Sequence, residues 1–128
     1  MSADWQPDEI NRRWSAAMNK GDVQALLDLY EPDAVVVPGP GAGATRGHDA
    51  IREALTWLVG LGGAVTHQPR CWLRCGDIAM GSITFQLNSA NGAQGEPLTL
   101  AGTTAEVIRR QPDGTWKYLI DHPFAFGS

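Results

Sequence analysis

The apolar residues between Pro7 and Gly21 recur every three or four positions, which is the spacing of an amphipathic helix. Proline suits the first turn of a helix and glycine commonly ends one, so both bounds agree with this interpretation. Asp22 can cap a second helix, whose apolar repeat continues to Tyr30. The sequence therefore predicts two consecutive helices at the start of the chain.

A β-branched run at 34–37 predicts one short strand, which a proline ends. The segment 38–47 is rich in glycine and proline, and we expect it to form a flexible rim. Helical spacing then returns and stops at Gly60, with either His48 or Asp49 as the cap. A third helix is therefore expected before the second half of the chain begins.

From residue 64 onward the pattern changes to alternating apolar and polar positions, which predicts strands separated by turns. The expected strands cover about 64–74, 77–87, 98–110 and 115–124. Helices followed by a run of antiparallel strands indicate an α+β fold, and strands this long should curve around the helices. We therefore expect a cone with a cavity at its wide end, formed by one domain of 128 residues.

Composition and charge narrow the choice of partners. The chain is 43% hydrophobic and 19% charged, with a net charge of -4, which argues against a nucleic-acid-binding surface. No apolar run approaches the roughly 20 residues of a membrane span. The first residues lack the pattern of a signal peptide, so the expected location is the cytoplasm.

The two cysteines, Cys71 and Cys75, lie four residues apart on a predicted strand. That spacing separates them by roughly 13 Å, which is too far for a disulfide. Two cysteines alone also offer too few ligands for a metal site. We interpret them as small buried apolar residues, and the sequence predicts neither a metal nor a cofactor.

The last hairpin carries the candidate chemistry. Its turn, 111–114, has the residues of a type I turn followed by a left-handed glycine. That loop predicts a register with Glu106 opposite Ile120 and Thr104 opposite His122. Glu106 and His122 would then share one face of the sheet, about 7–8 Å apart at the backbone.

A plain two-residue loop would reverse this parity and bring Glu106 beside Asp121 instead. His122 suits general acid–base catalysis because its ordinary pKa of about 6.5 lies near working pH. A Glu106–His122 pair could promote enolisation, dehydration or cyclisation next to a carbonyl group. The alternative is that both side chains have only a structural role.

Further candidate ligand contacts are aromatic or hydroxyl-bearing side chains on the predicted helices and strands. These are Trp14, Tyr30, Trp57, Trp72, Thr104 and Tyr118. They could form the walls of a pocket for a flat molecule, or they could be ordinary core residues. His67 and Arg70 have opposite parity on their strand, so at most one of them faces the cavity.

Several short motifs resemble the NTF2-like, or SnoaL-like, superfamily. They are Asn19-Lys20-Gly21-Asp22, Glu31-Pro32-Asp33-Ala34, Arg46-Gly47-His48-Asp49 and the ending Asp113-Gly114-Thr115-Trp116. The ending is similar to the DUF4440 branch, which is related to the kinase association domain. The resemblance implies an NTF2-like (cystatin-like) cone with three N-terminal helices packed on a curved sheet. It also implies a homodimer formed through the convex sheet face and a small organic ligand on the concave side.

This superfamily includes ketosteroid isomerases, polyketide cyclases and dehydratases. Ketosteroid isomerase uses an Asp base with a Tyr and a protonated Asp. Here Trp14 stands roughly where that Tyr would lie, Pro38 or its neighbours where the base would lie, and Glu106 near the protonated acid. The first two departures argue against steroid isomerisation. The resemblance therefore implies a cofactor-free lyase, isomerase or cyclase, or alternatively a non-catalytic module for ligand binding or assembly.

Overall fold

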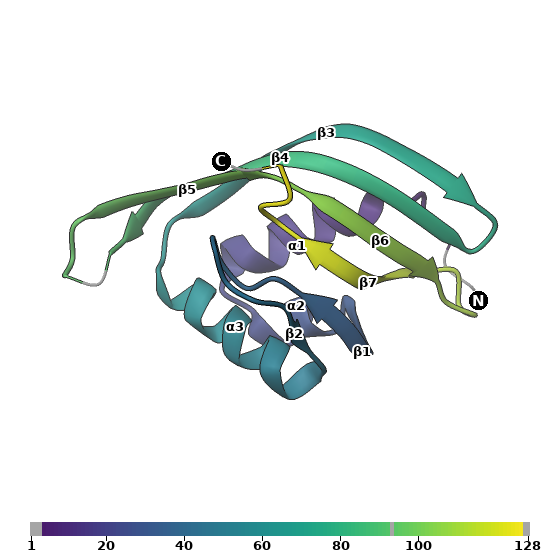
Figure 1. Cartoon of the computed structure of the whole chain (residues 1–128), viewed down its shortest axis with the longest axis horizontal. Coiled ribbons are helices and arrows are strands. Elements are labelled where there is room, and N and C mark those ends of the chain that lie inside the picture. The colour runs from purple at the N-terminus through teal and green to yellow at the C-terminus, as the bar shows by residue number, and fades with distance from the viewer. Residues whose placement is uncertain (1–3, 93, 127–128) are drawn as a thin grey trace.

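The computed structural model describes residues 4–92 and 94–126. Within these residues, three helices in the first half of the chain pack against one curved sheet, as an α+β fold requires (Figure 1). The elements are α1 (Glu9–Lys20), α2 (Val23–Leu27), β1 (Tyr30–Val36), β2 (Thr45–Arg46), α3 (His48–Gly60), β3 (Ala64–Cys75), β4 (Ile78–Asn91), β5 (Pro97–Thr103), β6 (Ala105–Arg110) and β7 (Trp116–His122). The predicted fold class is confirmed.

The strands follow the order β2-β1-β7-β6-β4-β3, and β5 also pairs with β4. β1 runs parallel to β7, whereas the other pairs are antiparallel, so the sheet is mixed. The long strands β3 and β4 arch over the helices (Figure 1). One face of the sheet is therefore concave and covered by helices, and the other is convex and open.

The helix bounds differ from the predicted ones at two places. α2 ends at Leu27, and Tyr30 instead begins β1, where it pairs with Tyr118 of β7. The centroids of the two rings lie 5.0 Å apart. Tyr30 is therefore buried, as its spacing from Leu26 and Leu27 predicts, but it is buried by this aromatic contact and not as part of a helix. At the start of α3 the N-cap is Gly47, with φ of 92°, and neither His48 nor Asp49 caps the helix.

The predicted strand 98–110 forms two strands, β5 and β6, with Thr104 between them. The Thr104 backbone N–H donates to the Ile83 carbonyl at 2.9 Å, and its hydroxyl accepts from the Ile83 N–H at 3.0 Å. This contact keeps both strands on β4 while the ladder is interrupted. Thr104 itself is buried.

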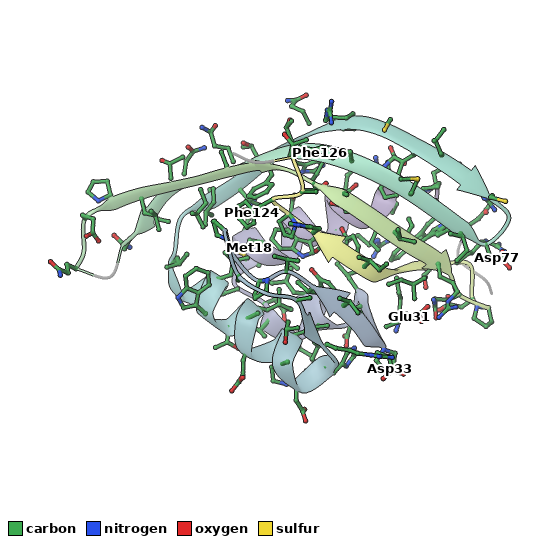
Figure 2. The ribbon with its side chains drawn as sticks, in the orientation of Figure 1. Met18, Glu31, Asp33, Asp77, Phe124 and Phe126 are labelled. Carbon is green, nitrogen blue, oxygen red and sulfur yellow. The ribbon has the colours of Figure 1, made fainter. Side chains whose placement is uncertain are left out.

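The core lies between the helices and the concave face of the sheet. Its largest fully buried side chains are Trp116, Tyr30, Tyr118, Ile10, Leu26, Leu27, Ile51, Leu87 and Ile108. Met18 points from α1 towards this core, whereas Asp33 and Asp77 lie at the periphery (Figure 2). Burial of these side chains stabilises the fold, because each Å² of apolar surface removed from water contributes ~25 cal/mol.

Both cysteines are exposed on β3, so the prediction that they are buried is wrong. An irregularity between Pro69 and Cys71 shifts the register of β3 against β4, and Cys71 then pairs with Ser82. No helix among the described residues is long and apolar enough to cross a membrane.

Candidate functional site

The last hairpin begins as predicted and then changes register. Gly114 has φ of 86° and donates to the Gln111 carbonyl at 2.9 Å, as expected for the three-residue loop. Arg110 pairs with Trp116 and Ile108 with Tyr118, in agreement with the predicted register. Beyond them the register shifts at a bulge between Val107 and Ile108, so the rest of the predicted pairing is wrong.

The bulge brings two carboxyl groups together. Glu106 lies opposite Asp121, and Ala105 lies opposite His122. An extra residue in β7 reverses the parity of the strand, which turns Asp121 to the concave face. Glu106 and Asp121 are only 3% and 7% exposed, although both line a pocket. Glu106 therefore lies beside Asp121, as a two-residue turn would have predicted, but the cause is the bulge in β7 and not the turn.

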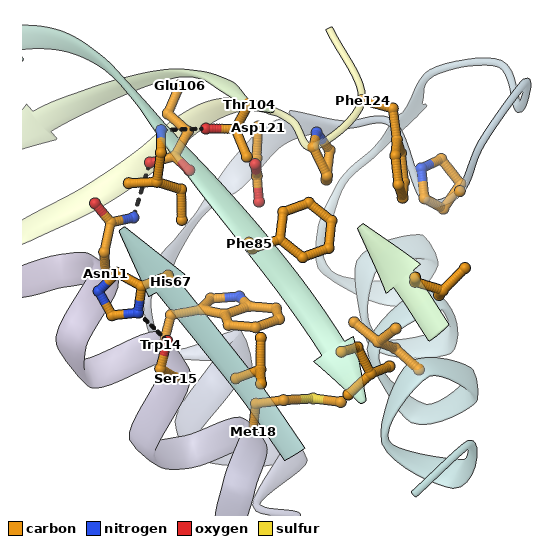
Figure 3. A pocket seen from close by; sticks show the side chains of 18 of the residues that line it. Asn11, Trp14, Ser15, Met18, His67, Phe85, Thr104, Glu106, Asp121 and Phe124 are labelled. Atoms are coloured by element: carbon orange, nitrogen blue, oxygen red, sulfur yellow. Dashed lines mark hydrogen bonds between the residues drawn. The ribbon is translucent and has the colours of Figure 1, made fainter. Parts of the chain in front are cut away.

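The pocket lies between the helices and the concave face of the sheet (Figure 3). It contains about 730 Å³ of atom-free space, counting its open mouth. Its lining residues are Asn11, Trp14, Ser15, Met18, Pro38, Gly39, Pro40, Trp57, Leu58, Val65, His67, Ile83, Phe85, Leu87, Leu100, Thr104, Glu106, Tyr118, Asp121, Pro123 and Phe124. Most of these are apolar, and the two carboxyl groups lie at one end.

Helix α1 supplies the hydrogen-bond partner of Glu106. The Asn11 amide nitrogen donates to Glu106 Oε1 at 2.9 Å and to the Tyr118 hydroxyl at 2.9 Å. Asn11 is only 3% exposed, so this contact is shielded from water. Its amide oxygen, Oδ1, is buried and has no hydrogen-bond partner among the described residues.

Asp121 has a different partner. The Tyr30 hydroxyl donates to Asp121 Oδ2 at 2.8 Å and accepts from the Trp14 indole N–H at 2.9 Å. Tyr30 is fully buried behind the pocket, whereas Trp14 lines the pocket. Asp121 is thus connected to α1 through one buried hydroxyl group.

Burial dominates the electrostatics of this pair. It raises the pKa of Glu106 to about 8, with the negative charge of Asp121 as the next contribution, while the hydrogen bond from Asn11 opposes the rise. Burial also raises the pKa of Asp121, to about 6, against the hydrogen bond from Tyr30. Neither carboxyl group forms a salt bridge among the described residues. Burial and the repulsion between the two negative charges therefore favour retention of a proton by this pair, and the pKa of Glu106 is raised further than that of Asp121.

This arrangement can perform proton transfer. Two carboxyl groups with separated pKa values can supply a general acid and a general base at the same pH. The described part of the chain contains no group of three His, Cys, Asp or Glu side chains that could hold a metal ion. The two carboxyl groups that line the pocket can themselves supply acid–base chemistry.

The structure brings four of the six predicted ligand contacts to the pocket. Trp14, Trp57, Thr104 and Tyr118 line it, while Tyr30 lies behind Asp121. The remaining one, Trp72, is absent from the lining because its indole lies across Gly81 of β4.

His122 is half-buried and accepts a hydrogen bond from the Phe124 N–H at 3.3 Å. It does not line the pocket, and the predicted Glu106–His122 pair is not formed. A second histidine, His67, does line the pocket, where its Nδ1 lies 2.7 Å from the Ser15 hydroxyl oxygen. Burial, together with the charge of Arg12, lowers the pKa of His67.

Asn11 is not among the site residues predicted from the sequence. One signal could have found it: Asn11 is a polar residue at helical spacing with Trp14 and Met18, so it lies on the buried face of α1. A buried amide on this face of the helix needs a hydrogen-bond partner, and the strands that face the helix can supply one.

The sequence model described as "SnoaL-like domain" matches residues 11–119. A search of curated proteins gives no match. Among solved structures, the chain resembles a candidate calcium/calmodulin-dependent protein kinase type II association domain from Thiobacillus denitrificans, with a TM-score of 0.74 and 18% identity over 95% of this chain and 96% of that one. It also resembles a ketosteroid isomerase-like protein from Erwinia carotovora atroseptica, with a TM-score of 0.73 and 18% identity over 90% and 89% of the two chains.

A third similar structure is a candidate dehydratase of the NTF2-like family from Streptomyces avermitilis, with a TM-score of 0.71 and 19% identity over 91% of each chain. At these identities the structures establish the shared fold and no activity. The resemblance to the DUF4440 branch stays a prediction. The match to the family's sequence model extends from α1 into β7 and includes Asn11 and Glu106, and on this evidence the chain belongs to the SnoaL-like (NTF2-like) domain family.

Proposed function

We propose that this protein is a cofactor-free acid–base catalyst, a lyase, isomerase or cyclase, that acts on a small apolar molecule containing a carbonyl group. The supporting observation is the pair of buried carboxyl groups, Glu106 and Asp121, at the end of an apolar pocket. Burying two such groups without a cation is costly for the fold, and active sites are where such arrangements are common.

The two carboxyl groups take opposite roles in this proposal. Glu106 carries the proton and donates a hydrogen bond to the carbonyl oxygen of the substrate. Asp121 carries the charge and removes a proton from the carbon next to that carbonyl. The electron pair of the broken C–H bond moves into the new C=C bond, and the oxygen gains the charge that Glu106 stabilises. Return of the proton to another carbon, loss of a leaving group, or ring closure then gives an isomerase, a lyase or a cyclase.

The pocket indicates how the substrate would be oriented. Its inner end carries the carboxyl pair, and its walls include Trp14 and Phe85 (Figure 3). Trp57 on α3 also lines it and is 52% exposed, which places this ring where an entering molecule would meet it. A flat apolar molecule would therefore enter with its carbonyl end first, since a charged end would lose its water shell here.

The test is hydrogen–deuterium exchange at the carbon next to the carbonyl, followed by NMR with a panel of neutral cyclic and aromatic ketones. The purified protein should accelerate exchange for a subset of them. Glu106→Gln and Asp121→Asn should each reduce that rate by ~10²–10⁴-fold. Glu31→Gln is the matched control, because this carboxylate binds Arg109 outside the pocket. No exchange above the rate in buffer, or equal rates in both pocket variants and the native protein, would contradict the proposal.

One observation also favours an assembly role through the sheet. Leu73, Met80, Val107 and Ile120 are successive register partners across β3, β4, β6 and β7. Three of these side chains are strongly exposed, at 68% for Leu73, 53% for Met80 and 47% for Ile120. We propose that this apolar row joins two copies of the chain through their convex faces.

Sedimentation velocity tests the dimer. The native protein should sediment as a dimer, and Ile120→Lys should produce monomers because it places a charge within the apolar row, at the end formed by β7. Lys117→Glu changes a charge on the same strand outside the row and should leave the dimer intact. A native monomer at all accessible concentrations would contradict the dimer without affecting the catalytic proposal.

A further inference from the structure

Three side chains from separate parts of the chain form a single hydrogen-bonded series, in which Trp14 and Asp121 line the pocket and Tyr30 lies behind it. The Trp14 indole N–H of α1 donates to the Tyr30 hydroxyl at 2.9 Å, and that hydroxyl donates to Asp121 Oδ2 at 2.8 Å. Tyr30 is 1% exposed, so water does not compete for these contacts. The direction of each hydrogen bond is therefore set by the side chains themselves.

The direction follows from the chemistry of the donors. An indole N–H can only donate, so the Tyr30 oxygen must accept from Trp14. Tyr30 has one hydroxyl proton, and the carboxylate of Asp121 is the acceptor that it reaches. Asp121 Oδ2 is consequently an acceptor, and because a carboxylate accepts this hydrogen bond more strongly than a protonated acid does, the series favours the ionised form of Asp121.

The hydrogen-bond partner of Glu106 is Asn11, whose amide can act either as a donor or as an acceptor. The Asn11 amide has a donor side and an acceptor side, and its oxygen Oδ1 is buried without a partner among the described residues. A half-turn of the amide would present Oδ1 to a protonated Glu106 and to the Tyr118 hydroxyl, which now accept from Nδ2. The number of hydrogen bonds among these three side chains would be unchanged, so the rotation lets Asn11 accept from a protonated Glu106, with Nδ2 then taking the buried position that Oδ1 occupies now.

The geometry points to Tyr30, held by Trp14, as a positioning residue that keeps the negative charge on Asp121 and the shared proton on Glu106. This inference rests on the proposed function, because it explains which carboxyl group is the base and which is the acid. Tyr30 does not line the pocket and acts only through Asp121.

The other groups around Asp121 do not provide an alternative cause. The titratable side chains that face the pocket or Asp121 are Glu106 on β6, Tyr118 on β7, Tyr30 on β1 and His67 on β3. The pocket residues of α1, α3 and β4 are uncharged. Burial raises the pKa of both tyrosines well above 10, so both are neutral at physiological pH. Among these groups only Tyr30 donates a hydrogen bond to Asp121.

The experiment follows the ionisation of each carboxyl group without any substrate. Asp and Glu are labelled with ¹³C at the side-chain carboxyl carbon, and Glu106→Gln and Asp121→Asn assign the two signals during an NMR pH titration. In the native protein Asp121 should ionise at lower pH than Glu106. Tyr30→Phe should raise the midpoint of Asp121 by about one to two pH units, because a charged acceptor loses its donor.

Tyr118→Phe is the matched control, since it removes a buried hydroxyl that bonds Asn11 and not Asp121. Its Asp121 midpoint should stay at the native value. Trp14→Phe keeps the Tyr30 hydroxyl but frees its orientation, and it should raise the midpoint by less than Tyr30→Phe does. This variant also tests the inference if Tyr30→Phe does not fold. The inference is overturned if Asp121 moves no more in Tyr30→Phe and Trp14→Phe than in Tyr118→Phe, or if Glu106 ionises first in the native protein.

The result is independent of the fate of the proposed activity. If the midpoints move as expected but no ketone exchanges its protons, the positioning role stands and the catalytic proposal fails. If ketone exchange depends on both carboxyl groups but the titration midpoint of Asp121 does not respond to Tyr30→Phe, the catalytic proposal stands and the positioning role of Tyr30 fails.

Discussion

Replacing Glu106 by Gln should make the protein more stable in alkaline solution, although it removes a buried hydrogen-bonded group. Glu106 has a pKa of about 8 in the folded protein and an ordinary value of 4.5 when unfolded. Between these values the folded state holds a proton that the unfolded state has lost. Stability conferred by Glu106 is therefore complete below about pH 4.5 and is lost as the pH rises towards 8.

The size of the effect follows from the same values. Each pH unit in this interval changes the free energy of unfolding by ~1.4 kcal/mol, so the native protein should lose about 2–3 kcal/mol between pH 6 and pH 8. Asp121 adds to the loss mainly below its pKa of about 6, which makes pH 6–8 the informative interval. The amide that replaces the carboxyl group in Glu106→Gln cannot ionise, and its oxygen can still accept from Asn11.

Urea denaturation at pH 6, 7 and 8 measures this prediction. The midpoint of the native protein should fall by about 1 M over the interval, whereas that of Glu106→Gln should stay nearly constant. Glu31→Gln is the control: hydrogen bonding to Arg109 lowers the pKa of Glu31, so this variant should keep the native slope. Equal slopes for the native protein and Glu106→Gln would refute the reasoning that burial keeps Glu106 protonated.

Further substitutions test the packing and the assignment of roles. Gly81→Ala would place a Cβ 2.4 Å from ring atoms of Trp72, and thermal unfolding should show a loss of about 1–3 kcal/mol with altered tryptophan fluorescence. Asp22→Ala removes the side chain that caps α2 and should cost about 1 kcal/mol in urea denaturation. His122→Asn should keep ketone exchange within about tenfold of the native rate, far above that of Glu106→Gln; a loss equal to that of Glu106→Gln would restore His122 as a catalytic group.

The helices and the turn could be predicted from the sequence because their signals are local. The apolar stripe of α1 ends at Gly21, which has φ of 70°, and the turn 111–114 closes with a left-handed Gly114. Both features depend on residues within a few positions of one another. The same local reasoning correctly assigned the first pairs of the hairpin, Arg110 with Trp116 and Ile108 with Tyr118.

The carboxyl pair could not be fixed in the same way because it depends on a bulge. The register shifts between Val107 and Ile108, and nothing in the alternating pattern of β7 marks the extra residue. The parallel neighbour β1 pairs with both sides of that irregularity, so the register of β7 is set by tertiary packing. One inserted residue is enough to replace His122 by Asp121 on the concave face.

The end of α2 shows the same limitation. Leu26, Leu27 and Tyr30 fit one helical stripe, and all three are buried, yet Tyr30 belongs to a strand. Its place is determined by pairing with Tyr118, which lies far along the chain in the last strand. Helical spacing identified a buried residue there and could not identify its partner.

Infrared spectroscopy of the ligand-free protein at pH 7 tests the central claim most directly, because a buried protonated carboxylic acid has a C=O stretch separate from that of a carboxylate. The account predicts one such band, which disappears in Glu106→Gln and not in Tyr118→Phe. A spectrum with no protonated carboxyl group at pH 7, or a band unchanged in Glu106→Gln, would contradict the claim that Glu106 and Asp121 share one proton in the pocket.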